Sequence, residues 1–85
     1  MIHKDKVENY SGTMQELAEE IGNLKYDALS DFLNLLANKI QRDGNNDESR
    51  GSIHLASSLH DCSTQLTTCK ASIDKAWKIC KPYMK

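Results

Sequence analysis

Apolar residues recur along much of the chain at spacings of three and four, which is the spacing of one face of an α-helix. The first such stretch begins at Thr13, after a mainly polar segment over residues 1–10 that shows no periodicity. Thr13 and Glu16 match a capping box, in which a hydroxyl and a carboxylate satisfy backbone amides at a helix start. We therefore expect a flexible N-terminal arm over residues 1–10 and a single helical domain over residues 11–85.

A second apolar stretch follows Gly22, and the sequence allows two interpretations of this glycine. Either a short helix ends there, or one helix continues at a cost of about 1 kcal/mol for the glycine. The apolar stripe changes phase across Gly22, which favours a kink or a short break. The stretch then predicts a helix that ends near Arg42, because Gly44 lies just past a turn containing Lys39 and Arg42. We expect the following residues, 43–47, to form a polar loop.

The third stretch has the most regular pattern, with eight residues alternating at spacings of four and three. They are Leu55, Leu59, Cys62, Leu66, Cys69, Ile73, Ala76 and Cys80. The charged residues of this stretch all lie off this line, and Pro82 is expected to end the helix. A helix over 48–81 would be on the order of 50 Å long. We expect these eight residues to form the seam along which the helix packs on the front half of the chain.

The pattern predicts an all-α fold, either an antiparallel helical hairpin or a three-helix arrangement with a long C-terminal helix. Charge supports the antiparallel orientation, because residues 69–85 hold five lysines against one aspartate while residues 1–50 hold ten acidic and six basic side chains. We expect this orientation to bring three lysines towards three glutamates: Lys70, Lys75 and Lys78 towards Glu16, Glu19 and Glu20.

Two helices bury only one stripe each, and apolar residues remain outside both stripes. They are Leu24, Leu33, Leu35, Ile53, Trp77 and Ile79. Something else should cover them. A homodimer that forms a four-helix bundle is the simplest solution, because the same patch is used twice. Another protein is the alternative partner.

Side chains that could support catalysis or hold a metal are present but not in recognisable patterns. Cys62 and Cys69 are about 10 Å apart along a helix, too far for a disulfide within the chain. His54 and His60 are six residues apart and do not form an i,i+4 metal pair. No glutamate is followed by a histidine three residues later, as helical-bundle metal sites normally require. We expect no catalytic site, no metal and no cofactor.

Composition limits the classes of partner and the cellular compartments that fit this chain. The net charge of −1 argues against general nucleic-acid binding, which usually needs a strongly basic surface. No apolar run is long enough to span a bilayer, and the first residues do not resemble a signal peptide. Three cysteines, an odd number, fit a reducing compartment. We therefore expect a cytoplasmic protein.

Residues 51–68 contain no Lys or Arg and are rich in Ser and Thr. Small uncharged side chains allow another surface to approach closely, although they are equally consistent with an ordinary polar surface. Our hypothesis for the partner-binding residues is Ser57, Ser58, Thr64, Thr67, Thr68, Trp77 and Lys78. We expect a non-enzymatic interaction module: an adaptor, a regulator or an inhibitor of another protein. The alternatives are a nucleic-acid-associated regulator using its lysine-rich C-terminus, a thiol-based sensor, and an enzyme subunit whose site forms between chains.

Overall fold

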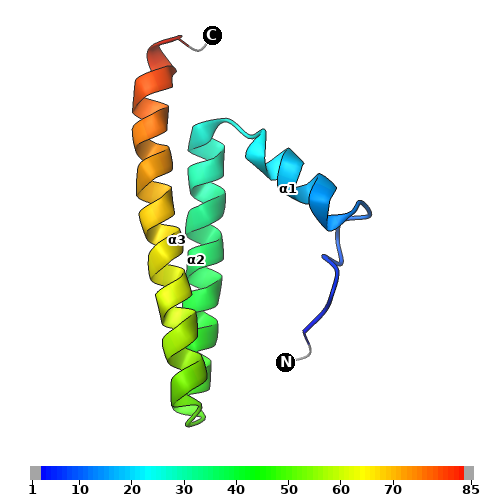
Figure 1. Ribbon diagram of the computed structural model, residues 1–85, viewed down its shortest axis with the longest axis vertical. Coiled ribbons are helices and arrows are strands. Elements are labelled where there is room, and N and C mark those ends of the chain that lie inside the picture. The colour runs from blue at the N-terminus through cyan, green and yellow to red at the C-terminus, as the bar shows by residue number, and fades with distance from the viewer. Residues whose placement is uncertain (1–2, 84–85) are drawn as a thin grey trace.

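All regular structure in residues 3–83, the residues that the computed structural model describes, is helical (Figure 1). The elements are α1 (Met14–Gly22), α2 (Tyr26–Ser49), α3 (Ile53–Cys80) and a short 3-10 helix, η1 (Lys81–Tyr83). The predicted all-α class is therefore confirmed. Residues 1–2 of the expected arm and Lys85 of the lysine-rich end lie outside the described residues.

Helix α1 begins and ends where the sequence predicts. The Thr13 hydroxyl accepts a hydrogen bond from the Glu16 amide (3.1 Å), and the Glu16 carboxylate accepts one from the Thr13 amide (2.9 Å). The helix ends at Gly22, where the amide of Asn23 bonds the carbonyl oxygen of Glu19. Both the capping box and the break at Gly22 are confirmed.

Helix α2 does not end near Arg42, so the predicted loop over 43–47 is wrong. The helix continues to Ser49, and the turn comes at Arg50–Ser52, where Gly51 has a φ of 85°. That left-handed conformation favours glycine. Gly44 is buried inside α2, and a Cβ atom there would lie 2.8 Å from the His60 ring of α3. This glycine therefore allows a side chain of the other helix to lie against α2.

Helix α3 is one uninterrupted helix of 28 residues that ends just before Lys81 and Pro82, as predicted. It runs antiparallel to α2, and the two helices lie side by side as a hairpin (Figure 1). The antiparallel hairpin is therefore confirmed. Helix α3 begins at Ile53 rather than at the expected residue 48, because α2 continues to Ser49.

The contact line between α2 and α3 differs from the predicted seam. Its buried residues are small along most of its length: Ser30, Ala37 and Gly44 on α2, and Ala56 and Ser63 on α3. At the loop end Asp47 of α2 is also buried and pairs with Arg50. Ala56 and Ser63 each follow a predicted seam residue by one position. Leu55 is instead 52% exposed, and Cys62 and Cys69 are exposed as well. The seam prediction is wrong for these three residues, because small side chains permit a closer approach of two helix backbones than leucines do.

Helix α1 leaves the hairpin at its open end and does not pack along it. In Figure 1 α2 lies between α1 and α3, and the Cα positions span only 14 Å along the shortest axis. The expected approach of the α3 lysines to the α1 glutamates is therefore wrong, because the break at Gly22 turns α1 away from α3. The lysines and glutamates find nearer partners. Lys70 pairs with Asp74 (2.9 Å), and Glu20 accepts a hydrogen bond from Tyr10.

Candidate protein-binding surface

The hairpin has two broad faces, one on each side of the contact line, and one of them is polar. His60 bridges the helices on this face, with Nδ1 3.1 Å from Gln41 Oε1 and Nε2 3.4 Å from Glu48 Oε2. Nearer the open end, the Ser30 hydroxyl donates to Asp74 Oδ1 (2.5 Å). We call this surface, defined by Ser30, Gln41, Glu48, His60 and Asp74, the polar face.

The charge of Asp74 is stabilised by its neighbours. The Ser30 hydroxyl makes the largest contribution to lowering the pKa of the Asp74 carboxyl, and the hydrogen bond from Lys70 (2.9 Å) adds to it. Asp74 thus links the open end of α3 to the start of α2. The polar groups of this face satisfy one another across the hairpin.

The opposite face is apolar. On α3 it comprises Leu55, Leu59, Cys62, Leu66, Cys69, Ile73 and Ala76. A small hollow of about 150 Å³ at the loop end joins the two helices, so Asp43 of α2 belongs to the same side of the hairpin as Leu55 and Leu59. The polar residues His3, Asn46, Asp47 and Arg50 also line this hollow. Leu36 and Leu29 precede Asp43 by seven and fourteen residues, and residues seven apart share one side of a helix. We call this surface, formed by the seven α3 residues together with Leu29 and Leu36, the apolar face.

Within residues 3–83 the apolar face is covered only in part, with His3 of the arm reaching the hollow beside Leu55 and Leu59 at its loop end. The buried apolar residues of this range are Ala37 and Ala56, each 2% exposed, and no large side chain is fully buried. The leucines of the apolar face are half-buried at best. The outer border of the face on α3 is uncharged and consists of Ser58, Gln65, Ser72 and Ile79, of which Ile79 is 72% exposed. A long uncharged strip is therefore open to solvent along α3.

The residues that the sequence singled out for partner binding all lie on α3. Thr64, Thr67 and Thr68 donate their hydroxyls to carbonyl oxygens four residues back in α3, at 3.0 to 3.1 Å. Such bonds satisfy the hydroxyls within the helix. Ser57, Ser58 and Lys78 are exposed, with Ser58 at the border of the apolar face.

Trp77, the remaining member of that group, is half-buried near the contact line. The ammonium of Lys25 lies 6.0 Å from the centre of its ring, within reach of a cation–π interaction. Sequence reasoning did not select Leu29 and Leu36 as partner-binding residues. Both leucines belong to the apolar stretch that follows Gly22, and that pattern predicts packing within the chain rather than contact with a partner.

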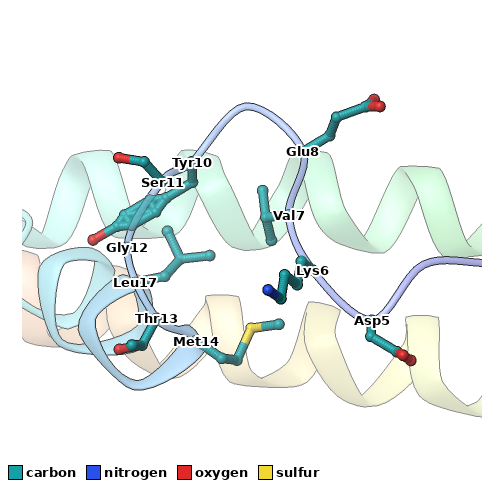
Figure 2. A pocket seen from close by; sticks show the side chains of 10 residues that line it. All are labelled: Asp5, Lys6, Val7, Glu8, Tyr10, Ser11, Gly12, Thr13, Met14 and Leu17. Carbon is teal, nitrogen blue, oxygen red and sulfur yellow. The ribbon is translucent and has the colours of Figure 1, made fainter.

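A second concave region lies where the arm meets α1 (Figure 2). This hollow of about 620 Å³ is lined by residues of the arm and of the first turns of α1. Val7, Met14 and Leu17 turn towards it, and Asp5 and Glu8 point outwards (Figure 2). Met14 and Leu17, on the apolar side of α1, therefore face the arm across this hollow, and Met14 stays 59% exposed.

The Tyr10 hydroxyl donates to the Glu20 carboxylate and fastens the arm to α1. This bond to Glu20 is the largest cause of the raised pKa of Tyr10. In residues 3–83 no three His, Cys, Asp or Glu side chains are grouped so as to hold a metal ion. None of the described helices combines the length and apolarity needed to cross a membrane.

Comparisons with known proteins place no relative beside this chain: no family model matches it, and no curated protein or solved structure is significantly similar to it.

Proposed function

We propose that the chain is a non-enzymatic protein–protein interaction module that docks the apolar face of its hairpin on another protein surface. The observation that carries the proposal is that α2 and α3 touch through small residues, while the larger apolar side chains beside them are only half-buried or, as for Leu55 and Ile79, exposed. Exposed apolar strips of this kind mark interaction sites more often than they serve the monomer.

The energetics of a small fold support the same proposal. A domain of this size buries a small share of its surface, and it usually needs a supplement to its core. Burial of apolar surface is worth about 25 cal/mol per Å². Covering Leu55, Leu59, Leu66 and Ile73 against a second surface would supply that supplement. The module would then gain stability from the contact through which it acts.

A pair of lysine variants on α3 tests the proposal. Cys69 lies on the apolar face and Thr64 does not, and both residues are exposed, so a lysine at either site should leave the hairpin folded. Tagged wild-type, Cys69→Lys and Thr64→Lys chains are used to capture proteins from the native host, and circular dichroism checks their helix content.

We expect Thr64→Lys to retain the proteins captured by the wild type and Cys69→Lys to lose them, because an ammonium on the apolar face would be desolvated by the partner. The same proteins in all three samples would contradict the proposal. Loss through Thr64→Lys alone would instead support the partner-binding residues predicted from the Ser- and Thr-rich sequence.

A further inference from the structure

We infer that the partner of the apolar face is a second copy of this chain, turned end for end, so that α3 lies antiparallel to α3 of the partner subunit. The inference rests on the proposed function, because it uses the same face. The inference goes further by naming the molecule that occupies the face and the orientation in which it binds. Four features of the hairpin support it: its dimensions, its uncharged strip, the charge at its two ends and the position of its centre.

The dimensions of the hairpin fit a dimer. Helices of 24 and 28 residues are about 36 and 42 Å long, and each is about 10 Å wide. The two helices together present roughly 800 Å², the area that each partner contributes to a standard interface. The molecule is a single layer of helices, 14 Å across its shortest Cα extent. Two such layers give the two-layer core that helical domains normally have.

The composition of the apolar face fits contact with itself. In a two-fold dimer, one patch meets the same patch on the other subunit, so a charge on the patch near the axis would meet its own copy. The α3 part of the face and its border, from Leu55 to Ile79, contain no charged side chain. Self-contact therefore brings no like charges together along α3.

The ends of the hairpin differ in charge, and this difference selects the orientation. The loop end, residues 39–61, holds four acidic and three basic side chains, a net charge of −1. The open end, residues 25–31 and 67–81, holds five basic and three acidic side chains, a net charge of +2. An end-for-end arrangement sets opposite charges against each other, whereas a parallel one sets +2 against +2.

The centre of the hairpin fixes the register. The Ser63 hydroxyl reaches the carbonyl of Ala37, which lies at the middle of α2, and the middle of α3 lies near Leu66. A two-fold axis in this region places Leu66 against Leu66 of the partner subunit. Cys62 then lies opposite Cys69 of the partner subunit, because the two cysteines are spaced almost equally about the axis.

Sedimentation of the full-length, reduced chain from micromolar to millimolar concentration tests the identity of the occupant. We expect a reversible dimer, dimerisation weakened at least about tenfold by Cys69→Lys, and no change with Thr64→Lys. A monomer throughout the range, or a dimer that Cys69→Lys leaves unchanged, would overturn the inference.

Zero-length cross-linking tests the orientation, in a Cys80→Ser background with diamide as the oxidant that takes up the two thiol hydrogens. We expect a covalent dimer when Cys62 and Cys69 are both present. Neither Cys62→Ser nor Cys69→Ser should cross-link alone, but an equal mixture of the two should. Cross-linking of either single-cysteine chain with itself would indicate a parallel dimer and overturn the orientation. So would a dimer that does not cross-link in the mixture.

The two proposals fail in different ways. If the chain is monomeric but its Cys69→Lys variant still loses the captured proteins, the second copy is not the occupant of the apolar face. The proposed function then still stands. If Cys69→Lys changes neither dimerisation nor capture, the apolar face is not a docking surface, and both proposals are wrong.

Discussion

The Ser63 hydroxyl of α3 donates a hydrogen bond to the backbone carbonyl oxygen of Ala37 in α2, over a distance of 2.9 Å. A side chain with one heavy atom beyond Cβ can reach the backbone of a neighbouring helix only where the two backbones lie close together. This contact therefore marks the line of closest approach in the hairpin, and it explains why that line is built from small residues. The leucines and cysteines beside it are left on an open face.

Enlarging Ser63 should separate the helices. We expect Ser63→Leu to destabilise the chain by about 1–3 kcal/mol, the usual cost of overpacking a tight contact. Ser63→Ala, which removes only the hydrogen bond, should cost about 0.5–1.5 kcal/mol. Denaturant unfolding gives both values. The matched control is Ser57→Leu, at an exposed site of the same helix, and a cost as large as that of Ser63→Leu would contradict the packing described here.

Replacing Gly44 should have opposite effects depending on His60. Alanine in a helix interior is favoured over glycine by about 1 kcal/mol. A Cβ at Gly44 would lie 2.8 Å from the His60 ring, however, and would push the ring from its contacts with Gln41 and Glu48. We expect Gly44→Ala to be neutral or destabilising in the wild type and stabilising by about 1 kcal/mol in a His60→Ala background. Equal effects in both backgrounds, measured by denaturant unfolding, would show that the two residues do not meet.

Asp74 should contribute to an acid-dependent loss of stability. Its pKa is lowered in the folded chain, chiefly by the Ser30 hydroxyl, so its contribution is present above the ordinary aspartate pKa of about 3.9 and is lost as the pH falls through the lowered value. We expect Asp74→Asn to remove this part of the pH dependence. We also expect Ser30→Ala to raise the pKa of Asp74 towards its ordinary value, as carboxyl carbon chemical shifts would report. An unchanged pKa in Ser30→Ala would count against the hydrogen bond.

Removing the cap of α1 should act locally. Thr13→Ala removes one side of the capping box, at a typical cost of about 1 kcal/mol to the helix. Since α1 does not pack along the hairpin, we expect faster amide hydrogen exchange in residues 14–22 and unchanged exchange in α2 and α3. Faster exchange throughout the chain would mean that α1 and the hairpin unfold together.

The helical class, both ends of α1 and the end of α3 were predictable from the sequence, because capping, glycine breaks and apolar periodicity act within a few residues. The capping box at Thr13, the break at Gly22 and the stop before Pro82 are examples. The end of α2 and the start of α3 were not predictable. Gly44 was misinterpreted because glycine is common both at the end of a helix and where two helices approach closely. Only the position of His60 distinguishes the two uses.

The candidate surface was less predictable than the helices. The sequence identified the apolar stripe of α3 correctly, but it could not specify what the stripe contacts. Ala56 and Ser63 gave no signal as contact residues, because a small side chain contributes little to an apolar pattern. Whether two backbones can approach closely depends on the geometry of both helices. The apolar pattern of one helix does not specify that geometry.

The position of the contact line is the central claim, and thiol labelling tests it most directly. Three chains, each with one cysteine, are compared at a concentration where sedimentation shows only monomer: Cys62 alone, Cys69 alone, and Ala56→Cys with the natural cysteines replaced by serine. We predict that Cys62 and Cys69 react nearly as fast as an unfolded peptide. The cysteine introduced at position 56 should react far more slowly, because it becomes accessible only when the hairpin opens. Protection of Cys62 and Cys69 together with fast labelling at position 56 would contradict the contact line and, with it, the open apolar face.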